Sequence, residues 1–343
     1  MRERWEQFTN TGSRWGSLVL VALLAVLPAV APPYLRSLVI EVLILAIFAM
    51  SLDLLLGYTG MVSFGHAAFL GLGAYLLAFF TRSVGANLLQ ALPVVLLGVA
   101  LFAVVAGFLA LRTSGIAFLM LTLAISQMLF GLAIKWSSVT GGSDGLAVAR
   151  PYVGIGGATL GFGPDRSFYY LTLASFALAW WLLRRITASP FGHALRGIKA
   201  NEPRMQALGY RTHRLKLTAF VIAGLFAGVA GMLLAAFNRH ASPELFGWAV
   251  SGEAIIMVIV GGSGTLVGPI LGATLVHLLE SYVSSYTELW RLVMGLVFVG
   301  FVLFAPQGII GLLRRRGRPP SEVELAAAIK EPEPAALPKE RRT

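Results

Sequence analysis

Ionisable side chains inside the long apolar runs are the first candidates for chemistry in this sequence. A charge within a membrane span costs about 2.5–3.5 kcal/mol on insertion scales, so such residues often belong to ion or proton pathways. His66 lies one turn after a predicted helix break, and His277 and Glu280 share a helical face through their i, i+3 spacing. We favour hydrogen-bonded structural histidines over a proton relay for both positions.

Four carboxylates lie within a turn or two of predicted helix ends, where side chains can reach the membrane interface. They are Glu41, Asp53, Glu253 and Glu280. The spacing of histidines and carboxylates matches no metal-ligand motif, and the sequence has no cysteine, which excludes thiolate chemistry and disulfides. These patterns predict a chain without a metal site.

The sequence contains no Gly-Lys pair at any position. The phosphate-binding loop of ATP-hydrolysing proteins requires Gly-x-x-x-x-Gly-Lys-Ser/Thr, because its amides and its lysine hold the phosphates. If ATP drives the function of this chain, another chain must bind it. We therefore predict a non-catalytic membrane subunit that carries no cofactor.

Two glycine-rich stretches interrupt the apolar runs, one from Gly57 to Gly73 and one from Gly261 to Gly272. In each, a hydroxyl residue, Ser63 or Thr265, is suited to cap a restarted helix, and Pro269 fits a first turn. A restart exposes N–H groups at the positive end of a helix dipole, which could briefly hold a substrate carboxylate. Six residues are therefore candidates for lining a translocation pathway: Ser63, Gly65, His66, Gly262, Gly264 and Thr265.

The alternative for these glycines is close packing of helices. Gly264, Gly268 and Gly272 are spaced by four residues, as are Gly224 and Gly228, and small residues at this spacing let membrane helices approach. Irregular backbone within a membrane is tolerated only where protein buries it or water lines it. Packing and pathway lining both remain open on the sequence alone.

A basic stretch from 184 to 216 separates two apolar runs. Ser189-Pro190 is an N-cap followed by proline, and Phe191, Leu195 and Ile198 form an apolar stripe. Asn201 can cap a second short helix that Gly209 ends. A lipid-attracted loop explains the charges, whereas two capped amphipathic helices that dock a soluble partner explain charges and stripe together. The candidates for partner coupling are Pro190, Phe191, Leu195, Arg196, Gly197, Lys199, Glu202, Leu208 and Gly209.

Composition decides the class of protein that must position these residues. Of the 343 residues 57% are hydrophobic and 13% are charged, against roughly 25% charged in a soluble domain. The net charge of +11 comes from short clusters beside apolar runs, which sets membrane orientation and argues against a nucleic-acid partner. Long apolar runs of about the length that crosses a bilayer are found at 16–33, 37–56, 64–81, 88–111, 115–134, 167–183, 215–237, 266–283 and 290–310.

Orientation requires one further segment. The stretch 184–216 and the basic cluster at 314–318 should both face the cytoplasm, so an even number of crossings must join them. The long runs supply three, and the short apolar run 251–261 restores parity as a tilted or half span. We predict an all-α polytopic membrane protein of about ten membrane segments, including broken or re-entrant half-helices, with both termini cytoplasmic.

This count divides the chain into three parts. Residues 1–15 form a cytoplasmic N-terminus, 16–313 a transmembrane domain, and 314–343 a charged, proline-rich cytoplasmic tail with too little apolar surface to fold. Within the transmembrane domain, 184–216 is a cytoplasmic loop, the candidate for partner coupling, and the glycine-rich stretch 137–166 is external. A retained first span is favoured over a cleaved signal peptide at 16–33.

Five stretches of this sequence resemble one family, the membrane permease subunits of the Liv-type branched-chain amino acid ABC importers, in their M-type form. The stretches run in family order across roughly residues 40 to 312 and are Leu54–Tyr75, Gly115–Ala124, Thr140–Gly145, Pro190–Tyr210 and Gly261–Pro269. The resemblance implies a multi-pass subunit of a bacterial inner-membrane importer for leucine, isoleucine and valine, working by alternating access. It also implies three kinds of partner: a second homologous permease, two ATP-binding subunits that bind the ATP, and an extracytoplasmic substrate-binding protein.

Two other functions stay open on the sequence. Closely similar permeases serve urea and short amides, so the same importer class with another substrate is one alternative. A secondary transporter or channel driven by ion gradients is the other, and it would require paired buried charges or an ion cage near the midplane. No such pair or cage is evident in the sequence.

Overall fold

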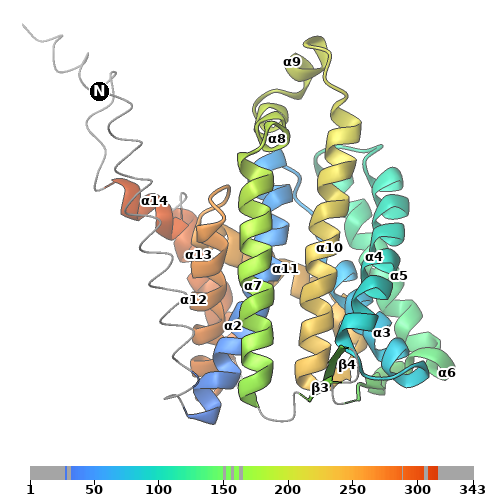
Figure 1. Cartoon of the computed structure of the whole chain (residues 1–343). Helices are drawn as coiled ribbons and strands as arrows, with labels where there is room; N and C mark the ends of the chain where they lie inside the picture. The colour runs from blue at the N-terminus through green and yellow to red at the C-terminus, as the bar shows by residue number, and fades with distance from the viewer. Residues whose placement is uncertain are drawn as a thin grey trace, which may run out of the picture.

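Helices dominate the computed structural model, which describes residues 28, 32–149, 152–155, 158–161, 165–287, 289–304 and 308–315 (Figure 1). The longer helices are α2 (Pro33–Asp53), α3 (His66–Ser83), α4 (Leu88–Ala110), α5 (Ile116–Lys135), α7 (Asp165–Ala188), α10 (Thr212–Asn238), α11 (Trp248–Gly261), α12 (Val267–Ser284) and α13 (Trp290–Phe304). The shorter helical segments are η1 (Leu54–Thr59), α6 (Ser137–Thr140), η2 (Gly142–Asp144), α8 (Pro190–Ala200), α9 (Glu202–Ala207), η3 (Pro243–Phe246) and α14 (Gly308–Arg315).

The predicted apolar runs correspond to these helices within a few residues. The run 290–310 is an exception, because it becomes α13 and α14, with residues 305–307 outside the described part. The predicted first span 16–33 and most of the predicted tail 314–343 also lie outside it.

The prediction of an all-α chain omitted four short strands. Strand β1 (Leu146–Ala147) pairs antiparallel with β4 (His240–Ala241), and β2 (Tyr152–Ile155) pairs antiparallel with β3 (Ala158–Gly161). Strands this short have too few residues to show an alternating pattern in the sequence. The class is therefore mostly helical, with two small sheets at one end of the bundle.

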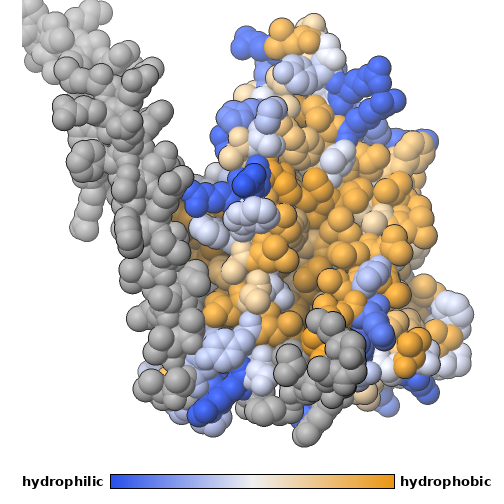
Figure 2. All heavy atoms as spheres, in the orientation of Figure 1, coloured by the Kyte–Doolittle hydropathy of each residue, from blue (hydrophilic) through white to orange (hydrophobic). Residues whose placement is uncertain are grey.

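Membrane-length helices run side by side through the bundle. Among the described residues, four helical segments are long and apolar enough to cross a bilayer: Pro33–Thr59, Leu88–Ala110, Ile116–Lys135 and Thr212–Asn238. In Figure 2 hydrophobic side chains cover the middle of the visible face, and hydrophilic ones gather toward its two ends. This band is the surface that a lipid bilayer covers.

The two loops with opposite predicted sides lie at opposite ends of the bundle. Helices α8 and α9 stand at one end, whereas α6 and the short strands stand at the other (Figure 1). The turn between α4 and α5 lies at the same end of the bundle as α8, because residues 113–115 line a cavity together with Lys199 and Lys216. Which end faces the cytoplasm stays a prediction.

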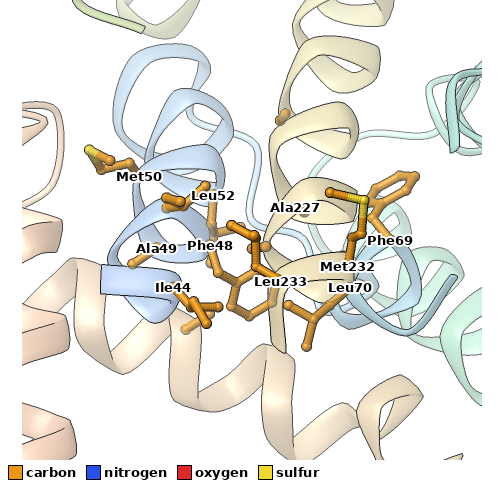
Figure 3. Packing of buried hydrophobic residues seen from close by; sticks show 14 of the residues in the cluster. Ile44, Phe48, Ala49, Met50, Leu52, Phe69, Leu70, Ala227, Met232 and Leu233 are labelled. Carbon is orange, nitrogen blue, oxygen red and sulfur yellow. The ribbon is translucent and has the colours of Figure 1, made fainter. Parts of the chain in front are cut away.

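Helices α2, α3 and α10 form the centre of the core. Figure 3 shows Ile44 and Phe48 of α2 pointing toward Leu233 of α10, and all three side chains are almost fully buried. Glycine permits the close approach of α3 and α10: a Cβ at Gly73 would overlap the carbonyl of Gly228, which is a four-residue-spaced glycine of α10. Close helix packing, one of the two roles left open for these glycines, is therefore the role of Gly228 where α10 meets α3.

Helix α11 is too short to cross a bilayer along its normal. Its 14 residues rise about 21 Å, against roughly 30 Å for the hydrocarbon layer. Helix α12 then returns antiparallel to α2, because Tyr34 bonds Ser281 near one end of the pair while Asp53 bonds Gly264 near the other. The predicted short segment is thus half of a helical hairpin whose turn is the second glycine break.

Candidate functional site

The predicted pair of amphipathic helices is present at one end of the bundle. The Ser189 hydroxyl accepts the Gly192 N–H at 3.4 Å, and Pro190 begins α8. The Asn201 side chain accepts the Arg204 N–H at 2.9 Å to start α9. Gly209, with φ +88°, follows the last turn, as expected for a helix stop. These local features confirm the predicted caps.

Helix α8 buries its apolar stripe against the bundle and packs its other side against α9. Leu195 and Ile198 are buried, and Phe191 is half-buried. Gly197 faces the Met205 side chain so closely that an added Cβ would lie 2.7 Å from its sulfur. The two short helices therefore form one packed unit, which can transmit a push on either helix as a single body.

Two basic side chains fasten α8 to the end of the first long span. Lys199 Nζ donates to the Gly57 carbonyl at 2.8 Å, and the Arg196 guanidinium lies 5.1 Å from the centre of the Tyr58 ring. Both contacts fall on η1, a segment of π-helix that continues α2. A π-helical turn leaves carbonyls outside the regular i→i−4 pattern, and such turns are frequent at functional sites.

The tip of the basic 184–216 stretch combines one ion pair with exposed apolar side chains. Lys216 pairs with Glu202 at 2.8 Å and ties α9 to the start of α10. Leu208 is 67% exposed and Tyr210 is 48% exposed, although both lie beyond the predicted stripe. Exposed apolar side chains at the end of a charged loop suit a groove on another protein.

A buried carboxylate holds the second glycine break. Asp53 has no exposed surface, and its two carboxylate oxygens accept the N–H groups of Gly264 at 2.6 Å and Leu266 at 3.3 Å. Thr265 Oγ1 accepts the Gly268 N–H in the first turn of α12 at 3.0 Å, although the N-cap residue of this helix is Leu266 and not Thr265 as predicted. The expectation that Asp53 reaches the interface is wrong, because its hydrogen bonds lie inside the bundle.

These bonds also correct the expectation that the second restart offers free N–H groups. The amides of Gly264 and Leu266 bond Asp53, so they are occupied within the chain. Leu266 adopts φ +54°, a left-handed conformation that is unusual for a branched side chain. The carboxylate stabilises this strained turn, because it bonds the amide of the strained residue directly.

The predicted lining residues of the first glycine break are also buried inside the bundle. Ser63 and His66 have no exposed surface, and Gly65 is buried. His66 Nε2 lies 2.7 Å from Ser51 Oγ and its ring stacks on Phe48 at 5.1 Å, which is the structural role favoured from the sequence. Ser63 is not the N-cap of α3, because the helix begins at His66 and Ser63 Oγ instead accepts the Gly65 N–H.

Two polar residues on α2 connect the breaks. Ser51 bonds His66 at the first break, and Asp53, two residues later, bonds the backbone of the second. Ser251 of α11 adds a third link, since its hydroxyl accepts the Ala67 N–H of α3 at 2.9 Å. Sequence reasoning did not identify Ser51 and Ser251, although a polar residue in an apolar run opposite a glycine break was an available signal.

Three further ionisable residues of the apolar runs, Glu41, His277 and Glu280, lie together. His277 Nε2 lies 3.0 Å from a Glu41 carboxylate oxygen, and His277 Nδ1 lies 3.7 Å from a Glu280 oxygen. The side chains of Glu41 and Glu280 are 34% and 27% exposed, so both keep some accessible surface while they pair with His277. The pairing joins α2 to α12 on the side away from α8 and α9.

Together, the bundle of membrane-length helices and the half-helix hairpin define a multi-pass helical membrane protein. Residues 34–302 match the family described as "Branched-chain amino acid transport system / permease component", and this chain belongs to that family. The match covers α2 through α13 almost completely. No solved structure matches the chain significantly.

Curated relatives agree with this family. A high-affinity branched-chain amino acid transport system permease protein LivM of Escherichia coli K12 is 29% identical over 322 residues, which cover 87% of this chain and 75% of the relative. A probable branched-chain amino acid transport permease protein LivH of Methanocaldococcus jannaschii is 24% identical, covering 78% of this chain and 89% of the relative. The chain is thus similar to two kinds of permease protein, and of these two relatives the LivM protein is matched over the larger share of this chain.

Proposed function

We propose that this chain is the membrane permease subunit of an ATP-binding-cassette importer that moves leucine, isoleucine and valine into the cell. Family membership across residues 34–302 is the observation that carries the proposal. The named substrate class of the relatives supports the cargo. The chain itself is non-catalytic and needs no cofactor, and partner subunits bind and hydrolyse the ATP.

The proposed assembly contains three further subunits and one soluble substrate-binding protein. A second homologous permease pairs with this one, which the similarity to both LivM and LivH proteins supports. Two ATP-binding subunits dock on α8 and α9 from the cytoplasm, and an extracytoplasmic binding protein delivers the substrate at the end that carries the short strands. The lipid bilayer covers the apolar band of Figure 2.

The proposed topology has about ten membrane segments, both termini in the cytoplasm and a bacterial inner-membrane location. Helices α10, α11, α12 and α13 supply four segments between the basic loop and the basic end of α14, which supports an even count there. The permease domain is 16–313, with 1–15 and 314–343 as its cytoplasmic extensions.

In the proposed mechanism, ATP binding closes the partner subunits and they push α8 and α9. The push reaches η1 through Lys199 and Arg196, and it reaches the second break because Asp53, next to η1, holds Gly264 and Leu266. Gly57 and Gly264 are in backbone contact, so η1 cannot move without the break. Rearrangement of the α11–α12 hairpin against α2 is the proposed outward opening.

Reconstitution tests the function directly. The chain with its partner permease, the ATP-binding subunits and the binding protein is placed in proteoliposomes, and radiolabelled leucine, isoleucine, valine and urea are offered with and without ATP. We expect saturable uptake of the three amino acids only with ATP. ATP-driven uptake of urea alone would overturn the substrate, and uptake driven by an ion gradient without ATP would overturn the class.

Leu208→Asp tests the docking of the ATP-binding subunits. Leu208 is exposed in this chain, so the substitution leaves the fold intact. In the complex, the new carboxylate would lie in an apolar groove of the partner, where it loses its hydration and weakens binding. We expect uptake to fall about ten-fold, because a buried contact of this kind contributes roughly 1–3 kcal/mol to binding. Co-purification of the ATP-binding subunits measures the loss, and Leu208→Met is the control that keeps the apolar contact. Unchanged co-purification and uptake would show that Leu208 does not contact the ATP-binding subunits.

A further inference from the structure

The six residues from Gly60 to Gly65 form irregular backbone between η1 and α3, and their side chains divide between two environments. Ser63 and Gly65 are buried in the bundle, together with His66. Met61, Val62 and Phe64 are half-exposed, and Gly60 is exposed. The outward side of this stretch is therefore formed by residues other than the predicted lining residues Ser63, Gly65 and His66.

Two cavities follow the outward side of the stretch along α5. One of about 340 Å³ lies at the end of α8, where Met61, Val62 and Leu119 meet Lys199. The other, of about 270 Å³, is lined by Phe64, Leu119, Leu123, Gln127 and Trp248. Leu119 lines both, so the cavities are neighbours on one face of α5, on which Leu119, Leu123 and Gln127 recur every four residues.

This groove lies at membrane depth, and lipid cannot be its only cover. Leu123 lies about two turns, roughly 11 Å, inside α5 by the helical rise, and Phe64 lines the same cavity. Irregular backbone facing hydrocarbon leaves amides and carbonyls unsatisfied at several kcal/mol each, so it occurs only where protein or water covers it. The exposed side of the 60–64 stretch must therefore face a partner chain or an aqueous passage.

Gln127 supplies the polar group of the groove. Its Nε2 atom is buried and has no hydrogen-bond partner among the described residues, although four apolar side chains surround the cavity. A buried amide without a partner costs about 1–3 kcal/mol, which a passing polar ligand can offset. The cavity volume of about 270 Å³ is close to the smallest volumes typical of ligand pockets, about 300 Å³. A small cavity with apolar walls and a single amide suits a small amphipathic molecule.

We propose that this groove is the passage of the transported amino acid: Phe64, Leu123 and Trp248 contact its branched apolar side chain, and Gln127 bonds its polar end. The inference rests on the proposed importer function and deepens it. The cavity at Lys199 continues the groove toward α8, so substrate leaves beside the helices that the ATP-binding subunits move. The second permease closes the open side.

Filling the groove tests the passage. Leu123→Trp is made in the full complex and compared in proteoliposomes with wild type and with Leu101→Trp, which adds the same ring to the exposed face of α4. We expect leucine uptake to fall at least ten-fold in Leu123→Trp, with ATP hydrolysis retained, and to stay within two-fold of wild type in Leu101→Trp. Wild-type uptake by Leu123→Trp would overturn the proposal, whereas absent uptake in wild type would instead overturn the importer function.

Thiol labelling adds a readout that does not depend on activity. The chain has no cysteine, so Phe64→Cys, Leu123→Cys and the control Leu101→Cys each carry a single thiol on it. In the assembled complex we expect a water-soluble maleimide to modify the first two in at least one nucleotide state, with leucine-loaded binding protein slowing the reaction, and not to modify Leu101→Cys. Failure of positions 64 and 123 to react in every state would show that lipid or a partner helix fills the groove.

Discussion

Gly197→Pro is expected to reduce ATP-driven uptake to background while the ATP-binding subunits continue to hydrolyse ATP. Gly197 lies in the third turn of α8 and faces Met205 of α9. Proline there removes a backbone N–H and clashes with the preceding turn, at a cost of about 3 kcal/mol or more, so α8 breaks between its cap and its contacts with η1. A broken α8 cannot pass movement from the partner to the first span.

The control for this variant is Gly197→Ala, which keeps the helix and displaces only the flexible end of Met205. A milder test of the same route is the double charge reversal Arg196→Glu with Lys199→Glu, which removes the contacts with Tyr58 and the Gly57 carbonyl. Uptake and ATP hydrolysis are measured in the same proteoliposomes, with membrane insertion verified for each variant. Normal uptake by Gly197→Pro and by the double reversal would exclude energy transfer through α8.

Asp53→Ala is expected to cause the largest loss of stability among single substitutions at the helix breaks. It leaves the N–H groups of Gly264 and Leu266 buried without an acceptor, and each unsatisfied group costs about 1–3 kcal/mol. It also releases Leu266 from the bond that stabilises its left-handed conformation. The thermal midpoint of the detergent-solubilised complex, measured beside uptake, should fall for both reasons.

Asp53→Asn separates the two roles of this side chain. The amide keeps one oxygen that can accept the Gly264 N–H, so a part of the stability should return, whereas the bond to Leu266 is lost. We expect a smaller fall in thermal midpoint than for alanine and a large residual loss of uptake. Ser63→Ala is the matched control, since Ser63 is also buried but bonds only the nearby Gly65 N–H among the described contacts. A thermal midpoint of Asp53→Ala equal to that of wild type would show that the break does not depend on the carboxylate.

Local features of the fold were predictable because they depend on neighbours in the sequence. Ser189-Pro190, Asn201 and Gly209 specify the ends of α8 and α9 through capping bonds within four residues, and the structure has them. The short run at 251–261 was expected from charge parity, and α11 occupies it. The family resemblance was likewise carried by contiguous stretches, and the match over 34–302 confirms it.

Contacts between distant segments were not predictable from local pattern. Asp53 was expected at the interface, yet it bonds Gly264, 211 positions later in the chain. Ser63 and Thr265 had the same signal for capping, but the N-cap residues are Gly65 in α3 and Leu266 in α12. Thr265 still bonds a first-turn N–H of its helix, that of Gly268, whereas Ser251 of α11 supplies the bond to the start of α3. The free N–H groups expected at the second restart are occupied for the same reason: a side chain from another helix reaches them.

The sequence by itself determined that this is a membrane protein with broken helices, a capped basic loop and no phosphate-binding loop, since hydropathy, caps and motifs are local properties. Only the tertiary structure decided which groups meet. Packing α2 against α10 and α12 places Ser51 and Asp53 on the two breaks. The direction of each side chain in the 60–65 stretch decides that Phe64, rather than Ser63, faces the groove. A buried polar group must find a partner somewhere in the bundle, and the sequence does not say where.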